Sequence, residues 1–341
     1  MLAPSFRSFD TLYLGGGTPS VLSDELLGDL LDGLRRLLSI HADAEITIEV
    51  NPGDIDAGRS HRLRSLGIGR VSVGVQSFDD GILRFLGRRH DRARAMAALD
   101  DLRSAGFDNV GIDIMWGIPN QTFAQLLSSV QQALVCAPEH ISCYALTIEP
   151  GTPLRRDVKA QRIPWKDDDD LAEEATALWQ ALAKAGYDHY EVSNFARTPQ
   201  YRSRHNSKYW MHVPYLGLGP AAHSFDGTRR WANVSSVRDY VASLRSGQLA
   251  RDFEETLTER QKMVERIMLG LRTSRGLPTS WVNTSAATAE GDASKMDASK
   301  IDGLVANGWI VVRDDRLCPT EQGMLVADAL AAALVEPWDN E

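Results

Sequence analysis

The first 150 residues alternate short apolar runs with helical stretches, and this alternation limits the possible folds more than any other feature. Helices are expected near 23–38, 62–66, 93–104 and 123–134, with Ser23 as the N-cap of the first. Strand and helix repeating over short connectors predict parallel βα units. The strands are TLYL, EITIEVN, RVSVGVQSF, VGIDIMWG and HISCYALTIE. Five such apolar strands favour a parallel barrel or partial barrel over a doubly wound sheet.

The composition changes after Pro164. A helix is expected from about 167, because Asp167 to Asp170 form an acidic first turn that suits the helix dipole and is better explained as a solvated cap than as a metal site. YEVSNFA is expected to form one further strand. The stretch 198–231 is rich in aromatic residues, Gly and His without clear periodicity, and we interpret it as an irregular bridge over the barrel mouth.

The C-terminal third is helical again from about Leu257. After a polar stretch at 283–294 come a helix, a hairpin of WIVV and LCPT joined by Arg313 to Arg316, and a last helix. This order has a winged-helix outline. The predicted organisation is therefore a partial barrel at 1–197, a bridging segment at 198–250 and a winged-helix-like domain at 251–337.

The charge balance and the cysteines restrict the class of protein. With 37 Lys and Arg against 46 Asp and Glu, the net charge is -9, which argues against a general affinity for nucleic acid. No apolar run is long enough to span a bilayer and no signal peptide is visible, so we expect a cytosolic protein. Its three cysteines fit a reducing compartment and have no metal-ligand spacing, which is typical of small apolar fillers.

Polar residues stand at the ends of the predicted strands, where a packed core would exclude them. The first strand ends in GGGTPS, in which glycines allow a close backbone approach and expose N–H groups to an anion. Glu49, Gln76 and Asp113 end later strands, and Arg88 follows in the next helix. Singly, each has a structural explanation. Because working residues of barrels gather at the carboxyl ends of strands, we expect them to surround one polar ligand there.

A second group of candidates lies in RHNSKYW and the YLGLGPAAHS that follows. It contains His205 and His223 beside large aromatic residues. A neutral His nitrogen can bind iron, and flat aromatic rings suit a planar macrocycle. Chemistry alone favours ordinary packing for such an aromatic, Gly-rich loop.

GGGTPS, IEVNP, GVQSF and GIDIMWGIP, in this order, resemble the radical-SAM domain of oxygen-independent coproporphyrinogen III dehydrogenases and HemW-type haem chaperones. The resemblance covers nearly the whole chain and implies a partial radical-SAM barrel with a HemN-type C-terminal domain. It implies that S-adenosylmethionine (SAM) is bound by Gly16, Gly17, Thr18, Glu49, Gln76, Arg88 and Asp113. The HNxxYW segment, which distinguishes HemW proteins and is implicated in haem handling, is intact as His205, Asn206, Tyr209 and Trp210. We take His205 as the iron-side residue and His223 as structural.

The family's CxxxCxxC motif, whose thiolates hold a [4Fe–4S] cluster, is absent from this sequence. The motif would precede GGGTPS, and the chain enters an interior-type strand within a dozen residues of Met1. We therefore expect the first barrel strand and its helix to lie upstream of a start that is assigned too late, in preference to a truncated relative. As written, the chain is expected to bind no such cluster and to leave SAM uncleaved.

The predicted function is a haem-binding chaperone that transfers haem to an acceptor protein. One alternative is a radical-SAM oxidoreductase acting on coproporphyrinogen III in porphyrin biosynthesis, which needs the absent cysteines. A second is a winged-helix nucleic-acid-binding protein. The net negative charge of the chain argues against it, as does the wing sequence RDDR, whose positive and negative charges cancel. The resemblance leaves open a membrane-associated acceptor and a homodimer.

Overall fold

The structure is a computed structural model that describes residues 6–283 and 296–335. The chain divides into two compact units. We call Asp10–Ser203 the barrel unit, and Met1–Phe9 together with Arg204–Glu341 the C-terminal unit. Phe6 belongs to the latter because its ring packs edge-on against Trp231, with the ring centroids 6.1 Å apart. The polar stretch 284–294 lies outside the described residues, and the domain limits at 197 and 250 stay predictions.

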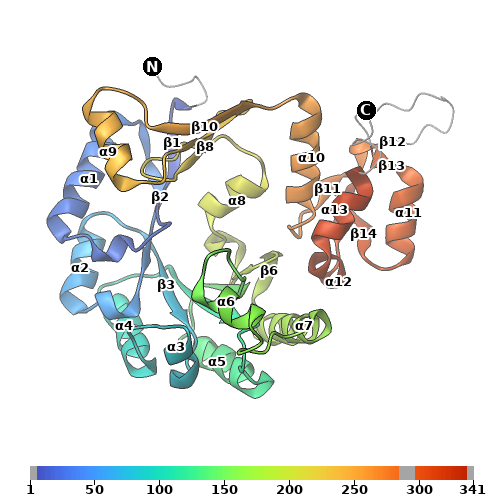
Figure 1. Cartoon of the computed structure of the whole chain (residues 1–341), viewed down its shortest axis with the longest axis horizontal. Coiled ribbons are helices and arrows are strands. Elements are labelled where there is room, and N and C mark those ends of the chain that lie inside the picture. The colour runs from blue at the N-terminus through green and yellow to red at the C-terminus, as the bar shows by residue number, and fades with distance from the viewer. Residues whose placement is uncertain (1–5, 284–295, 336–341) are drawn as a thin grey trace. The chain divides into compact units, whose positions relative to one another are not determined.

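One seven-stranded sheet forms the centre of the barrel unit (Figure 1). Hydrogen bonds join its strands in the order β1-β2-β3-β4-β5-β7-β6, and β2 to β5 run parallel. The predicted partial parallel barrel is thus confirmed. Its strands are β1 (Phe9–Leu14), β2 (Ile40–Val50), β3 (Arg70–Gln76), β4 (Val110–Trp116), β5 (His140–Ala145), β6 (Asp188–Glu191) and β7 (Asn194–Ala196).

Helices follow the strands and cover the outer face of the curved sheet (Figure 1). Their starts agree with local sequence chemistry. The Ser23 hydroxyl accepts from the Leu26 amide at 3.3 Å, and Asp167 caps the acidic first turn of α7, as predicted. The helices are α1 (Asp24–Leu37), α2 (Ala57–Ser65), α3 (Asp80–Phe85), α4 (Arg92–Ser104), α5 (Phe123–Val135), α6 (Pro153–Lys159) and α7 (Asp168–Lys184), with 3₁₀ turns η2 (Pro19–Val21), η3 (Pro52–Asp54) and η4 (Pro199–Tyr201).

The segment YEVSNFA differs from the prediction of a single strand. It forms the antiparallel strands β6 and β7, which meet at Val192 and Ser193, and β7 runs antiparallel to β5. The turn lacks the Asn-Gly or Asp-Gly pair that marks most tight hairpins, so the sequence pattern predicted one continuous strand. Glu191 Oε2 accepts a hydrogen bond from the Ser193 amide at 3.0 Å, and this side-chain bond stabilises the turn.

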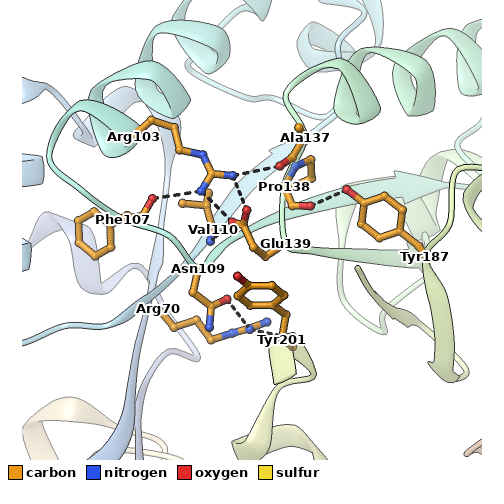
Figure 2. Close-up of polar contacts among 10 residues, drawn as sticks. All are labelled: Arg70, Arg103, Phe107, Asn109, Val110, Ala137, Pro138, Glu139, Tyr187 and Tyr201. Carbon is orange, nitrogen blue, oxygen red and sulfur yellow. Dashed lines mark hydrogen bonds and ion pairs between the residues drawn. The ribbon is translucent and has the colours of Figure 1, made fainter. Parts of the chain in front are cut away.

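A network of buried polar groups joins the strands at their amino ends (Figure 2). The Arg103 guanidinium donates to both Glu139 carboxylate oxygens, at 2.7 and 3.1 Å, and to the carbonyls of Phe107 and Ala137. Glu139 Oε2 also accepts from the Val110 amide at 3.0 Å. Because Glu139 is only 8% exposed, its charge depends on these donors, which fix the starts of β4 and β5.

Replacing Glu139 with Gln should lower the free energy of unfolding by about 2 kcal/mol. Loss of one partner from a fully buried pair costs roughly 3–5 kcal/mol, and the Arg103 side chain is 32% exposed, which reduces the effect. Urea denaturation measures the loss. The control is Asp157→Asn, which removes the solvent-exposed ion pair with Arg162 and should change stability by less than about 0.5 kcal/mol. Equal effects of the two substitutions would contradict the structural role of Glu139.

The segment 204–250 of the C-terminal unit contains regular elements that the sequence did not predict, while residues 211–222 lie outside any helix or strand. It forms α8 (Arg204–Trp210), β8 (His223–Phe225), β9 (Arg229–Asn233) and α9 (Val237–Arg245), and β10 (Arg251–Thr256) completes an antiparallel sheet in the order β10-β9-β8. These elements are too short for hydrophobic periodicity to reveal them. Packing of this segment over the barrel mouth stays a prediction.

The rest of the C-terminal unit has the predicted order of helix, hairpin and helix around its own apolar core. In the hairpin of β14 and β15, Asp314 and Asp315 have φ of 50° and 57°, as a two-residue turn of the I′ type requires. Among residues 6–283 and 296–335, no helix combines the length and apolar character needed to cross a bilayer. The elements are α10 (Glu259–Gly270), β11 (Leu277–Pro278), η5 (Thr279–Trp281), β12 (Val282–Asn283), β13 (Met296–Asp297), α11 (Ala298–Ala306), β14 (Ile310–Arg313), β15 (Arg316–Pro319), α12 (Glu321–Leu325) and α13 (Ala327–Val335).

Candidate cofactor and haem sites

The glycine turn after β1 is tied directly to the end of β2. Gly16 has a φ of 84°, and its amide donates to Glu49 Oε2 at 3.2 Å. The other oxygen of Glu49 accepts from the Tyr13 hydroxyl at 2.7 Å. Gly15 must lack a side chain here, because a Cβ would lie 2.8 Å from the Glu49 carboxyl. The turn and the strand-end acid therefore form one structure.

Asp113 is buried beside this turn on the polar face of the sheet. Its carboxylate accepts from the Ser72 hydroxyl at 2.9 Å and also interacts with the Ser142 and Tyr144 hydroxyls. Burial raises the pKa of Asp113 to about 6, and the charge of Glu49 acts in the same direction. Two acids of the predicted site thus lie close together, and the charge of Glu49 favours the protonated form of Asp113.

Arg88 and Gln76 meet at the end of β3. A Cβ on Gly74 would lie 3.1 Å from Gln76 Nε2 and 3.3 Å from Arg88 Nη2, so both side chains approach the same point. Arg88 donates to Asn51 Oδ1 at 2.6 Å and to the Gly74 carbonyl at 2.8 Å, and burial lowers its pKa. Gln76 has a φ of 68° at a register shift between β3 and β4.

A cavity of about 190 Å³ opens beside Arg88. Two of its lining residues, Thr18 and Arg88, were predicted for the site, and the others are Asn51, Gly53, Gly87, Arg89 and His90. The Asn51 amide donates to the Ser20 hydroxyl, which donates to Asp54, so the turn after GGGT is anchored to the end of β2. Two guanidinium groups and a hydroxyl around one cavity suit an anionic ligand group.

Of the seven residues predicted to contact SAM, the structure brings six together: Gly16, Thr18, Glu49, Gln76, Arg88 and Asp113. Gly17 is exposed in the same turn with open space around it. Sequence reasoning missed Tyr13, Asn51, Ser72 and Tyr144. A signal was available for three of them. Asn51 lies two residues beyond Glu49, Ser72 pairs with Glu49 across the strands, and Tyr144 lies two residues beyond Ser142, which pairs with Asp113.

The HNxxYW residues lie on α8, and helix geometry explains their spacing. His205 and Tyr209 are four residues apart, as are Asn206 and Trp210, so each pair shares one side of the helix. His205 Nε2 and the Tyr209 hydroxyl are 3.0 Å apart, and their rings are perpendicular. The Tyr209 side chain is 40% exposed and its ring also contacts Tyr215. An exposed aromatic and an imidazole thus occur together on this short helix.

His212 is a further histidine near α8 that sequence reasoning missed. Its Nε2 lies 2.9 Å from Glu265, its ring packs on Phe225, and burial lowers its pKa. With a φ of 55° it ends α8 in the left-handed conformation that usually favours Gly. His223 lies in β8 with its side chain exposed.

Comparison with known proteins shows the family. The radical SAM superfamily model matches residues 3–133, and the HemN C-terminal domain model matches residues 257–326. Heme chaperone HemW of Mycobacterium tuberculosis is 34% identical over 325 residues, which is 95% of this chain and 80% of that protein. Heme chaperone HemW of Escherichia coli is 35% identical over 336 residues, 95% of this chain and 83% of that protein. The chain belongs to the HemW family.

The fold of this HemW-family chain also occurs in a solved structure. The coproporphyrinogen III oxidase HemN of Escherichia coli, a radical SAM enzyme, superimposes with a TM-score of 0.79 at 23% identity. The match covers 96% of this chain and 78% of HemN. At this identity the likeness shows the shared fold, a radical-SAM half-barrel followed by a C-terminal domain.

Radical SAM proteins use SAM and a [4Fe–4S] cluster, and the residues present fit these two groups differently. SAM fits, because the strand ends combine acids, guanidinium groups and the buried Gln76 Oε1, which has no protein partner among the described residues. The cluster does not fit. Cys136, Cys143 and Cys318 are free, and the described residues contain no group of three potential ligands for a metal ion. No step through the cluster is therefore assigned to these residues.

Asp113 should make stability depend on pH in the acid range. Its pKa rises from 3.8 to about 6 on folding, so the folded state binds this proton more tightly. This proton adds ~3 kcal/mol to the free energy of unfolding. The contribution is complete below about pH 4 and is lost as the pH rises through 6. Asp113→Asn should remove this component and flatten the profile of unfolding free energy between pH 4 and 6. An unchanged profile in urea denaturation would show that Asp113 is not buried as described.

Proposed function

We propose that this chain binds haem and transfers it to an acceptor protein, with a SAM site at the strand ends of the barrel unit. The observation that carries the proposal is the intact HNxxYW set on α8. Membership of the HemW family supports it, since the relatives of known function are named heme chaperones. In this proposal His205 faces the haem iron, because a neutral imidazole nitrogen is a common haem ligand.

The remaining residues of the motif have roles that follow from their positions. The exposed Tyr209 ring offers a flat apolar surface to the macrocycle, and its hydroxyl, 3.0 Å from His205 Nε2, orients the imidazole. Asn206 and Trp210 provide a polar and an aromatic contact from the adjacent side of the helix. Because α8 has only seven residues and no buried side chain, it depends on its neighbours for stability and can adjust to a bound ligand.

In the barrel unit, the strand-end residues bind and orient SAM. Arg88 and Thr18 hold the carboxylate of its amino-acid tail in the cavity that they line, while Glu49 and Asp113 face its positive charge. Gln76 donates a hydrogen bond to the nucleoside through its amide nitrogen and accepts one from it through its amide oxygen. These residues are proposed to support haem transfer through binding.

The acceptor, the oligomeric state and the location also belong to the proposal. A protein that requires haem receives it, a cytosolic location agrees with the cysteine content, and a membrane-associated acceptor and a homodimer are compatible with the family. A role of the wing in nucleic-acid binding is not proposed. Arg313 and Arg316 both donate to backbone carbonyls of residues 274–276, so these charges already have protein partners.

Haem titration of the purified chain tests the function. We expect a shifted Soret band at one haem per chain, and His205→Ala should weaken binding about tenfold or more, because the iron loses its axial nitrogen. His61→Ala is the matched control, as it removes an exposed imidazole from α2. An unchanged Soret band in His205→Ala would overturn the ligand assignment. The absence of any haem binding by the wild-type chain would overturn the function.

Equilibrium dialysis with radiolabelled SAM tests the cofactor site. Arg88→Gln should weaken SAM binding about tenfold, because one charge-assisted hydrogen bond is worth roughly 1.5–3 kcal/mol. Arg84→Gln on α3 provides the control, since the Arg84 side chain is exposed and does not line the cavity. Equal SAM affinities for wild type and Arg88→Gln would contradict the assignment of the cavity.

A further inference from the structure

Tyr13 holds the carboxylate of Glu49 in a fixed direction. Its hydroxyl donates to Glu49 Oε1 at 2.7 Å, and the Gly16 amide donates to Glu49 Oε2 at 3.2 Å. Both donors are neutral, and Glu49 makes no ion pair within the described part of the chain. The charge of Glu49 is therefore oriented by hydrogen bonds and left without a compensating cation.

The ring of Tyr13 contributes to the same arrangement. A Cβ on Gly15 would lie 2.5 Å from Tyr13 Cε1 and 2.8 Å from the Glu49 carboxyl, so ring, turn and carboxylate fill one space. Burial raises the pKa of Tyr13, with Glu49 as the second cause, so the phenol keeps its proton and remains a donor. Tyr13 thus has one role toward Glu49 at any physiological pH, that of a hydrogen-bond donor.

The surrounding charges show which ligand group the carboxylate would meet. Asp113 is the other acid near Glu49, and the charges of both raise the pKa of Tyr13. The cations Arg88 and Arg89 line the cavity together with Asn51, and Arg89 also pairs with Asp54 at 3.6 Å. Asp113 interacts electrostatically with Arg88, whereas Glu49 makes no ion pair among the described residues. A ligand that carries both signs of charge would meet its positive group at Glu49.

We propose that Tyr13 is a positioning residue, which directs Glu49 toward a positively charged ammonium or sulfonium group of the bound ligand. This inference rests on the proposed SAM site. Neither the GGGTPS motif nor the set of strand-end residues includes Tyr13. Its side chain acts through Glu49, and its removal should weaken only those ligands that carry the positive group.

The test is binding of three nucleosides to wild type, Tyr13→Phe and Tyr187→Phe by isothermal titration calorimetry. SAM carries an ammonium and a sulfonium, S-adenosylhomocysteine carries the ammonium alone, and 5′-methylthioadenosine carries neither. Tyr187→Phe is the matched control, because the Tyr187 hydroxyl also donates a buried hydrogen bond, to the Pro138 carbonyl at the amino ends of the strands (Figure 2).

In Tyr13→Phe we expect SAM affinity to fall about tenfold, or ~1.4 kcal/mol, and 5′-methylthioadenosine affinity to change less than about twofold. Loss of S-adenosylhomocysteine binding in parallel with SAM identifies the ammonium as the group that Glu49 meets, and its retention identifies the sulfonium. Tyr187→Phe should leave all three affinities unchanged. Equal losses for all three nucleosides in Tyr13→Phe, or no loss for SAM, would overturn the positioning role.

Hydrogen exchange of the peptide containing Gly15 to Gly17 supplies a second measurement that needs no ligand. Without the Tyr13 hydroxyl, Glu49 is free to rotate and the Gly16 amide loses its fixed acceptor, so exchange should accelerate several-fold in Tyr13→Phe and not in Tyr187→Phe. Unchanged exchange would overturn the inference whatever the ligand. If the wild-type chain binds none of the nucleosides while exchange accelerates in Tyr13→Phe, the SAM proposal fails. Tyr13 then orients Glu49 without a part in SAM binding.

Discussion

The candidate cofactor site depends on two carboxyl groups that neutral donors hold at the ends of β2 and β4. Glu49 accepts from Tyr13 and Gly16, and Asp113 accepts from Ser72 with further hydroxyls beside it. Hydroxyl and amide donors orient a carboxylate without cancelling its charge, so the site keeps a negative potential in partly buried surroundings. Burial raises the pKa of Asp113 to about 6, and its hydroxyl donors act in the opposite direction.

The parallel sheet brings these groups to one edge. Parallel strands place their carboxyl ends together, and the register pairs Glu49 with Ser72 and Asp113 with Ser142, so polar side chains of neighbouring strands share one face. At the amino ends, Arg103 and Glu139 form a fully paired network instead. One edge of the sheet is thus stabilised by an ion pair, while at the other edge Glu49 accepts only from neutral donors.

The sequence was informative where a residue's position along a strand decides its role. Strand ends, caps and the glycine turn could be predicted, because each depends on local chemistry at residues such as Ser23 and Gly16. Tyr13 could not, since its role depends on which residue of the neighbouring strand its side chain meets. The prediction of an irregular stretch at 198–231 missed α8, β8 and β9, because these elements are too short to show a periodicity of their own.

The HNxxYW motif and the strand-end residues belong to different units, so each can be assessed by itself. On α8 the motif combines a histidine with exposed aromatic surface, as a site for a planar macrocycle requires. In the barrel unit the acids and guanidinium groups at the strand ends suit a zwitterionic nucleoside.

A crystal structure with S-adenosylhomocysteine bound tests the central claim most directly. The account predicts one ligand molecule in contact with Glu49, Gln76, Arg88 and Asp113, with its carboxylate in the cavity beside Thr18 and its amino group toward Glu49. A ligand bound elsewhere, with these side chains in contact only with one another, would contradict the convergence of the strand ends on a single ligand.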